Sequence, residues 1–426
     1  MDDLRRKRHL DFALFLSALA LWVIGIFLVY SATYIHESGP LAGIYKQQIL
    51  WVVMALLIVV LIASIPGRII FESSYIFYGA SLLLLIAALG MGIEAKGAER
   101  WISIAGVKIQ PSEFAKVGLL LAISRYLSGN TVSLYKITTF IVPGLLILVP
   151  FALVLKQPDL GTALVFGVMA LPVFYWGGLT LLEVFYIISP GISLFLAALP
   201  LFLSYNVGGG GGGIVETIPW GIFFVIIIAA LYFNRPPIFV WAGVIVANIL
   251  TSTMVTVVWN SVLKDYQKMR IVSFINPQAD PFGAGYQVIQ SKIAIGSGHI
   301  FGKGYLQGTQ SRLSFLPEQH TDFIFSVLGE QFGLAGCVVV VLLFSFLIIR
   351  GLMLTRECGN RFINLIAVGA SAILCFHVFV NIAMTLGMMP VTGLPLPFLS
   401  YGGSFTVTVA ILVGLLLNAK LTDHDF

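Results

Sequence analysis

The chain has 426 residues, of which 58% are hydrophobic and only 10% are charged, with a formal net charge of +5. Soluble domains have about 25% charged residues, and so few polar side chains cannot cover a water-soluble protein of this length. The composition therefore indicates a polytopic membrane protein and excludes a disordered chain, a nucleic-acid-binding domain and a secreted disulfide scaffold.

Twelve apolar segments are each long enough, at about 20 residues, to cross the hydrocarbon core of a bilayer as a helix. They begin near residues 12, 47, 74, 111, 137, 161, 179, 217, 238, 323, 362 and 402. The apolar runs are continuous rather than alternating, which favours helices over a β-barrel. We therefore predict an all-α bundle of about 12 spans that forms a single integral membrane domain, 1–426.

The basic residues predict the orientation of this bundle. The charged N-terminal segment continues into an apolar stretch without a small-residue cleavage site, which favours a retained first span over a signal peptide. The short segments on the N-terminal side of the membrane hold 12 Lys and Arg residues, against 5 in the short segments on the other side. Both termini are therefore expected in the cytoplasm. The three cysteines, Cys337, Cys358 and Cys375, fall outside the external segments, so no external disulfide is expected.

Two segments interrupt the series of spans. Residues 260–322 are too polar to cross the membrane and too apolar for a free linker, so we expect an extracytoplasmic loop with short half-buried helices, one of them in YQVIQSKIAIGSG. A run of six glycines at 208–213 is interpreted as a flexible loop. It has no predicted phosphate-binding role, because no strand precedes it and no Lys-Ser/Thr pair follows it.

Ionisable residues within the predicted spans need an explanation, because they are costly at membrane depth. Glu113 and Lys116 are three residues apart on one helical face and form either a structural ion pair or part of a functional site. Asp159 lies at a helix junction and is interpreted as the N-cap of the sixth span. Glu330 is either a buried hydrogen-bonded carboxyl or part of a polar channel. Glu183 lies near the inner face and is expected to be solvated.

The long outer loop holds further candidates. Asp280 precedes a proline, which alone predicts only a turn. Glu318, His320 and Asp322 are possible metal ligands, but their spacing does not place them on one helical face; a loop cluster, or a helix cap at Asp322, is the simpler interpretation. No HExxH, P-loop or GxSxG motif occurs in a fitting context. From the residues alone, a transporter and an enzyme acting on a lipid-linked anion both stay open.

Five strings resemble the SEDS family (shape, elongation, division and sporulation), and most closely its RodA branch. They are GAERWISIAGVKIQPSEFAK at 97–116, QPDLGT at 157–162, ADPFGAGYQVIQSKIAIGSGHIFGKG, GTQSRLSFLPEQHTDFIFSVLGEQFG and GLPLPFLSYGGS at 393–404. They occur in the family's order and lie mainly in polar loops, where chance similarity between apolar spans cannot explain them. The family usually has ten spans, so 204–259 is interpreted as an extra two-helix insertion.

The resemblance implies a peptidoglycan glycosyltransferase that polymerises lipid II, an undecaprenyl-pyrophosphate-linked disaccharide peptide, into β-1,4 glycan strands for cell elongation and rod shape. It implies a class B penicillin-binding protein and other elongation-complex membrane proteins as partners, at the outer face of the cytoplasmic membrane, and no nucleic acid. It also implies that Asp280 is the essential acid and that Trp101 is functionally critical. A lipid II flippase and a non-catalytic scaffold are the alternatives.

The implied chemistry needs a base and a source of positive charge. Asp280 would remove the proton from the acceptor's 4-hydroxyl, in an inverting transfer. The leaving diphosphate would be stabilised by a cationic side chain or by a divalent ion, Mg²⁺ or Mn²⁺. The candidate substrate-binding residues are Arg100, Trp101, Glu113, Lys116, Lys292, Lys303 and Arg312. The candidate supporting residues are Asp159, Glu318, His320, Asp322 and Glu330.

Overall fold

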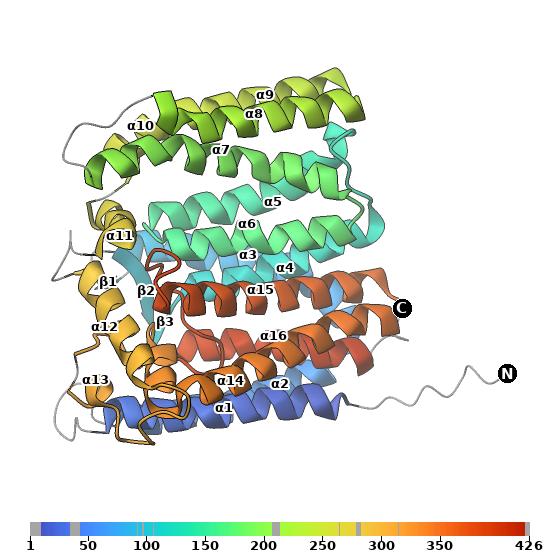
Figure 1. The fold of residues 1–426 in the computed structure, drawn as a ribbon. Coiled ribbons are helices and arrows are strands. Elements are labelled where there is room, and N and C mark those ends of the chain that lie inside the picture. Colours follow the sequence, from blue (N-terminus) through green and yellow to red (C-terminus); the bar gives the residue numbers. More distant parts are fainter. Residues whose placement is uncertain are drawn as a thin grey trace.

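The computed structural model of the chain describes residues 10–34, 43–91, 93–95, 98–104, 106–206, 214–263, 265–277, 283–313 and 315–421. It is a bundle of long helices that run side by side, as Figure 1 shows. These helices are α1 (Phe12–Thr33), α2 (Ile44–Ser64), α3 (Gly67–Met91), α4 (Pro111–Gly129), α5 (Ile137–Lys156), α6 (Leu160–Trp176), α7 (Leu181–Asn206), α8 (Ile214–Asn234), α9 (Ile238–Thr253), α14 (Ile324–Glu357), α15 (Arg361–Thr385) and α16 (Gly403–Leu421). The predicted all-α membrane architecture is confirmed.

Every predicted span corresponds to one of these helices. Nine of those in the described ranges are long and apolar enough to cross a membrane: α1, α2, α3, α5, α7, α8, α14, α15 and α16. The other three are α4, which carries charged side chains, and α6 and α9, with 17 and 16 residues. The third helix begins at Gly67, earlier than the predicted start near residue 74. The prediction followed the apolar run, which Arg68 and Glu72 interrupt; within the helix these two side chains pair with each other at 2.8 Å.

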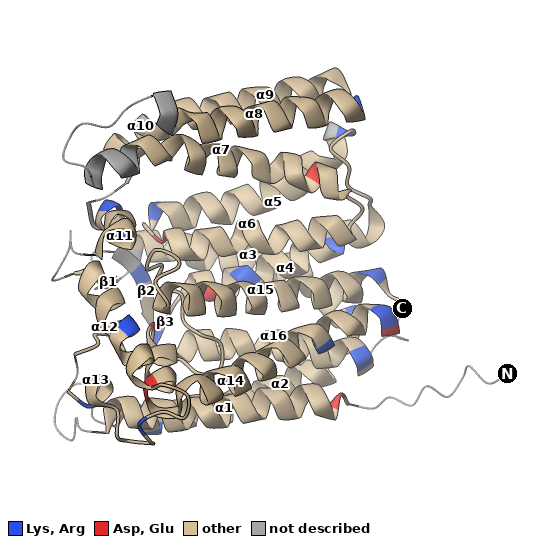
Figure 2. Ribbon diagram, viewed as in Figure 1, with Lys and Arg blue, Asp and Glu red and all other residues tan. Residues whose placement is uncertain are grey.

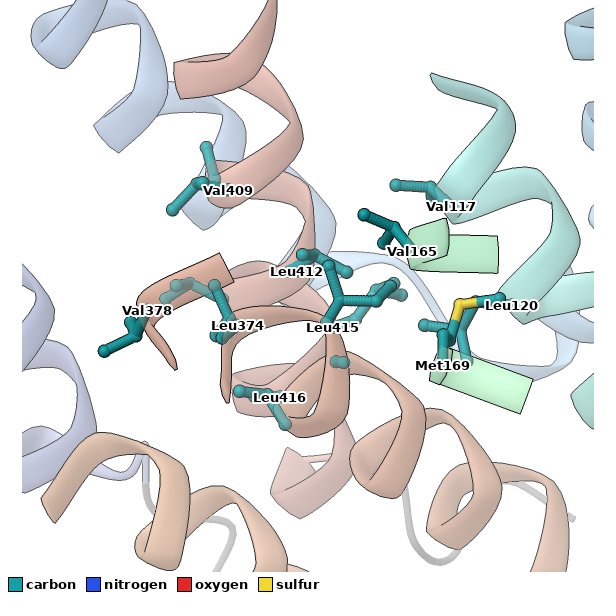
Figure 3. Packing of buried hydrophobic residues seen from close by; sticks show 14 of the residues in the cluster. Val117, Leu120, Val165, Met169, Leu374, Val378, Val409, Leu412, Leu415 and Leu416 are labelled. Atoms are coloured by element: carbon teal, nitrogen blue, oxygen red, sulfur yellow. The ribbon is translucent and has the colours of Figure 1, made fainter. Parts of the chain in front are cut away.

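The core of the bundle is formed around α15 and α16, whose apolar windows are the most deeply buried. Figure 3 shows side chains from α4, α6, α15 and α16 packed together, with Val117 and Leu120 facing Val165 and Met169. Within a membrane such packing, rather than exclusion from water, holds helices together, and small residues allow the closest approach. Gly25 of α1 is one of these, because a Cβ there would lie 2.3 Å from the carbonyl oxygen of Phe398.

The two ends of the bundle differ. One end, here called the terminal end, holds the start of α1 and the end of α16. There Asp11 Oδ2 lies 2.7 Å from Arg350 Nε and 3.4 Å from Lys420 Nζ, and both cations also pair with Glu357. The opposite end, here called the loop end, carries the small sheet and the short helices. Figure 2 shows that charged residues gather mainly at these two ends, as expected for helices that lie in lipid.

The loop end contains a three-stranded antiparallel sheet that the all-α prediction did not include. Its strands are β1 (Ile93–Ala95), β2 (Ala98–Ile104) and β3 (Val107–Ile109), in the order β1-β2-β3. Four short helices and a π-helical turn follow α9: α10 (Val255–Val257), the turn at Val258–Val262, α11 (Asp265–Ile275), α12 (Ala284–Ser297) and α13 (Thr309–Arg312). The predicted short helices of the outer loop are thus present, and α12 corresponds to YQVIQSKIAIGSG.

A break in α14 brings the segment after α12 against the bundle. Gly333 has φ 63° and ψ −162°, a conformation that only glycine adopts easily, so the helix bends there. A Cβ at Gly333 would also lie 2.4 Å from the backbone nitrogen of Gly302. The first turns of α14 therefore support the loop end, while the remainder of the helix continues to the terminal end.

Helices α7, α8 and α9 share a second, smaller hydrophobic core around Tyr186, Ile227 and Leu231. Glu183, near the start of α7, was expected to be solvated, and this expectation is wrong: the residue is 1% exposed. Its carboxylate accepts hydrogen bonds from Ser133 Oγ at 2.9 Å and from the N–H groups of Leu134 and Thr180 at 2.8 Å. Burial is possible because these donors satisfy the charge.

Candidate functional site

Arg100 attaches the small sheet to the turn before α6. Its guanidinium donates to the carbonyl oxygen of Gln157 at 3.1 Å and to that of Pro158, and it lies 3.6 Å from Asp159 Oδ2. Asp159 is the N-cap of α6 and accepts from the N–H of Thr162 at 3.1 Å, so the predicted cap is confirmed. Arg100 therefore has a positional role, whatever part it takes in binding substrate.

Glu113 and Lys116 form a buried ion pair in α4, as their spacing predicts. Lys116 Nζ lies 2.9 Å from both Glu113 carboxylate oxygens, and the two residues are 3% and 0% exposed. The structure adds a third member, because His377 Nε2 of α15 lies 3.1 Å from Lys116 Nζ. The ring of Phe405 lies 5.5 Å from the same nitrogen, within the range of a cation–π contact. This is a closed cluster inside the bundle.

Glu330 is the buried hydrogen-bonded carboxyl of the two alternatives left open by the sequence. It is 0% exposed and accepts from Lys303 Nζ at 3.0 Å and from Thr309 Oγ1 at 3.1 Å. The N–H groups of Gln310 and Ser311 donate to it at 2.8 and 3.0 Å. Glu330 thus attaches α13 to α14, and Lys303 is already engaged in this attachment.

Lys292 and Arg312 differ from the other candidate cations. Both are exposed, and neither side chain has a hydrogen bond or an ion pair within the described ranges. Lys292 projects from α12 over Gly387, where an added Cβ would lie 2.2 Å from its Cε. Trp101, on β2, is half-buried. Of the predicted cations, these two are therefore the ones whose side chains are exposed and make no polar contact with the described part of the chain.

The helix cap predicted at Asp322 is wrong. Helix α14 begins at Ile324, its N-cap is Phe323, and no side chain caps it. The preceding segment instead turns on itself, since the carbonyl oxygen of Glu318 accepts from the N–H groups of Thr321 and Phe323 at 3.2 and 3.3 Å. Glu318 has φ 52°, which is unusual outside glycine and accompanies this turn.

Glu318, His320 and Asp322 lie in the loop between α13 and α14, which agrees with the simpler interpretation of a loop cluster. The carbonyl oxygen of His320 accepts from the N–H of Tyr401 at 2.9 Å, and that of Asp322 accepts from Asn381 Nδ2 at the same distance. In the part of the chain that the structure describes, no group of three His, Cys, Asp or Glu side chains could hold a metal ion.

An apolar cavity of about 460 Å³ lies beside α12. Ile295 and Gly296 of α12 form one side, and Leu334 and Cys337 of α14 with Ile382 of α15 contribute to the other. Lys292 lies one helical turn before Ile295 on the same face of α12. The apolar cavity and the exposed Lys292 side chain are therefore both carried by α12.

Asp280, the predicted base, lies outside the described residues. The chain is described up to residue 277, two residues after α11 ends, and again from Gly283, the N-cap of α12. Its catalytic role stays a prediction.

His377 is the residue of the buried cluster that sequence reasoning missed. Among scattered histidines it showed no motif, and its partner Lys116 is 261 positions away. The available signal was an ionisable side chain inside an otherwise apolar span, which is the same signal that selected Glu113, Lys116 and Glu330.

The family model described as "Cell cycle protein", which covers FtsW, RodA and SpoVE, matches residues 12–207 and 219–424. The unmatched internal stretch is thus 208–218, and all of α9 and most of α8 lie within the second matched segment. The interpretation of 204–259 as an insertion stays a prediction.

Two curated relatives match over almost their whole length. The peptidoglycan glycosyltransferase MrdB of Escherichia coli K12 is 34% identical over 412 residues, 97% of this chain and 94% of that protein. The peptidoglycan glycosyltransferase RodA of Treponema pallidum is 35% identical over 429 residues, 97% and 98% of the two chains.

Two solved structures share the fold. A chain from a peptidoglycan synthase complex, studied for its coordination of polymerization and crosslinking, has a TM-score of 0.67 and 31% identity, covering 97% of this chain and 98% of that one. The rod shape determining protein RodA of Thermus thermophilus has a TM-score of 0.60 and 26% identity, covering 96% of both chains.

Proposed function

This chain belongs to the FtsW, RodA and SpoVE family of cell cycle proteins, and from that premise we propose that it is a peptidoglycan glycosyltransferase. The observation that carries the proposal is the alignment, along nearly the full chain, with relatives named for that activity. The proposed substrate is lipid II, and the product is a β-1,4 glycan strand for cell elongation.

Two features of the loop end favour a lipid-linked anionic substrate. Lys292 and Arg312 have exposed charges that are not engaged with the described part of the chain. The apolar cavity of about 460 Å³ is lined by Ile295 and Gly296 of α12, which follow Lys292 by about one helical turn. It could receive part of a polyprenyl chain, or apolar side chains from the membrane helix of a partner. Both uses are compatible with a site at the membrane surface.

The proposed glycosyl transfer needs no reactant besides the donor and acceptor sugars. The Asp280 carboxylate takes the proton from the 4-hydroxyl of the acceptor sugar as that oxygen attacks the anomeric carbon of the donor. A glycosidic bond forms with inversion, and the bond to the polyprenyl diphosphate breaks. The departing diphosphate carries negative charge, and Lys292 and Arg312 are the cations that we propose stabilise it. A bound Mg²⁺ or Mn²⁺ would supply further charge stabilisation; among the described residues, no group of three His, Cys, Asp or Glu side chains could hold it.

We propose that the loop end faces outward and that both termini are cytoplasmic. The start of α1 and the end of α16 share one end of the bundle, since Asp11 pairs with Lys420. The excess of basic residues in the short segments at that end supports a cytoplasmic location. A structural neighbour comes from a peptidoglycan synthase complex, which supports a class B penicillin-binding protein as the proposed partner.

The test uses the full chain, co-purified with its penicillin-binding partner and supplied with lipid II. Wild-type protein should form glycan strands, and Asp280→Asn should lose at least about 100-fold in rate, since general bases contribute 10²–10⁴-fold. Asp265→Asn is the matched control, because it removes another acid of the same loop. Glycan synthesis at the wild-type rate in the Asp280→Asn variant would exclude this base. Transbilayer movement of labelled lipid II without any polymer would instead support the flippase alternative.

A further inference from the structure

The buried cluster fixes the protonation of His377. A lysine ammonium group can only donate, so His377 Nε2, at 3.1 Å from Lys116 Nζ, must accept. The proton of the neutral ring is then on Nδ1, which lies 3.4 Å from the carbonyl oxygen of Pro395. That oxygen can only accept, so both contacts require the same tautomer. Lys116 thus donates to Glu113 Oε1 at 2.9 Å and to His377, and Glu113 Oε2 lies in the same ion pair, 2.9 Å from Nζ, without a hydrogen bond of its own.

The carbonyl of Pro395 belongs to a non-helical segment whose carbonyl oxygens accept hydrogen bonds from side chains of another element. Residues 393–402 read GLPLPFLSYG, and the two prolines have no N–H to pair within a sheet or helix. Helix α15 supplies the donors from one face, His377 to Pro395 and, one turn later, Asn381 Nδ2 to the carbonyl oxygen of Leu394 at 2.8 Å. Phe398 and Leu399 of this segment are buried against the bundle.

The same segment holds the end of the outer loop. Ser400 Oγ donates to the carbonyl oxygen of Thr321 at 2.6 Å, and the N–H of Tyr401 donates to that of His320 at 2.9 Å. Asn381 Nδ2 also reaches the carbonyl oxygen of Asp322 at 2.9 Å. Within the segment, the N–H of Leu396 donates to Ser400 Oγ at 2.8 Å. Hydrogen bonds and the Pro395–Leu396 peptide therefore connect the buried charges, through 393–402, to the residues that close the loop carrying Asp280.

We propose that His377 is a positioning residue for glycosyl transfer: it couples the buried Glu113–Lys116 pair to segment 393–402 and so fixes the loop end that holds the reacting groups. This inference rests on the proposed function. His377 does not touch the substrate. It acts by giving Lys116 a second acceptor and Pro395 a donor, and loss of either contact frees the segment to shift. A displacement of 1 Å at a reacting group can cost about 100-fold in rate.

Two substitutions distinguish the hydrogen bonds of the His377 nitrogens from the packing of its ring. His377→Phe keeps the contact with Phe405, whose ring centroid lies 4.9 Å away, and removes both nitrogens. His377→Gln retains an acceptor and a donor. With lipid II and the partner protein, we expect His377→Phe to lower kcat about 10- to 100-fold with KM changed less than about threefold. His377→Gln should recover kcat to within about threefold of wild type.

A matched control measures the effect of destabilisation alone. Val380, on the same helix, is 1% exposed and lies outside the cluster, so Val380→Ala should lower the thermal midpoint without a comparable fall in kcat. The inference is overturned if His377→Phe retains wild-type kcat, if glutamine fails to rescue it, or if Val380→Ala loses as much activity at an equal loss of stability.

Two measurements that do not depend on activity keep this inference distinct from the proposed function. Nitrogen-15 NMR of histidine-labelled protein should show an unprotonated Nε2 at His377, and a protonated Nε2 would overturn the inference. Hydrogen exchange of the amides in 393–402 and 318–323 should be faster in His377→Phe than in wild type, and equal exchange would contradict the coupling. If the wild-type complex makes no glycan while both measurements succeed, the proposed function fails and the coupling stands.

Discussion

The attachment of α13 to α14 through Glu330 predicts a measurable local destabilisation in Glu330→Gln. One carboxylate oxygen accepts from Lys303, Thr309 and the N–H of Gln310, and the other accepts from the N–H and Oγ of Ser311. A glutamine has one acceptor oxygen. The least costly rotamer keeps that oxygen towards the first three donors and turns the NH₂ group towards Ser311, where it faces the Ser311 N–H and the Ser311 hydroxyl loses its acceptor.

The cost follows from the groups left without partners. A buried N–H that loses its acceptor costs about 1–3 kcal/mol, and loss of the Ser311 hydroxyl bond adds about 1 kcal/mol. The ion pair with Lys303 adds about 1 kcal/mol or less, because that side chain is 27% exposed and screened by solvent. The total is roughly 3 kcal/mol, which corresponds to about 100-fold in a local opening equilibrium.

Hydrogen exchange measured by mass spectrometry on the protein in nanodiscs tests this value. The amides of 303–312 should exchange about 100-fold faster in Glu330→Gln, whereas amides of α16 should be unaffected. Lys303→Met is the matched control, since it removes only the partly exposed partner and should accelerate exchange no more than about tenfold. Unchanged exchange in Glu330→Gln, or a larger effect in Lys303→Met, would refute the assignment of Glu330 as the attachment point.

Two further predictions concern stability. Burial raises the pKa of the Asp11 carboxyl, but hydrogen bonds from the Leu14 N–H and the Arg350 guanidinium outweigh it, so the pKa lies below its ordinary value of 3.8. The stabilisation from ionised Asp11 is thus complete above about pH 4 and is lost as the pH falls further. The thermal midpoint of Asp11→Asn should therefore be lower than that of wild type at pH 7, and the two midpoints should converge in acid. A difference between the midpoints that stays constant with pH would contradict this. Gly25→Val should prevent correct packing of the helix bundle, because its Cβ would lie 2.3 Å from the Phe398 carbonyl oxygen. The variant should then not elute as a single monodisperse peak in size-exclusion chromatography. Gly79→Ala, with nothing within 4 Å of the added carbon, should be tolerated; equal behaviour of the two variants would refute the close contact.

The features predicted correctly from the sequence are those determined by neighbouring residues. Continuous apolar runs predicted the helices, since a chain in lipid must satisfy its backbone hydrogen bonds within each span. The cap by Asp159 and the pair of Glu113 with Lys116 each depend on a separation of three residues. Such contacts follow from helical geometry alone.

The features that were missed depend either on distant parts of the chain or on local patterns too short to interpret. Glu183 is buried because it accepts from Ser133 and Leu134, about 50 positions earlier, a distance that local patterns do not reveal. Asp322 does not cap α14, because the turn at Glu318 delays the helix to Ile324. The strands at 93–109 are too short for a clear alternating pattern. Asp280 was selected by family resemblance, and its own residues predicted only a turn.

The contacts of α1 have a consequence for biogenesis. Asp11 is 339 positions from Arg350 and 409 from Lys420, and Ser31 is 300 positions from its partner Gln331. At a synthesis rate of about 5–20 residues per second, the first helix waits roughly 20–80 s for the last one. During that interval the Asp11 carboxylate and the Ser31 hydroxyl must be satisfied by water, lipid headgroups or the insertion machinery. Closure of the bundle is therefore a late event, and a nascent chain stopped before α16 would leave the first helix without one of the partners that hold it.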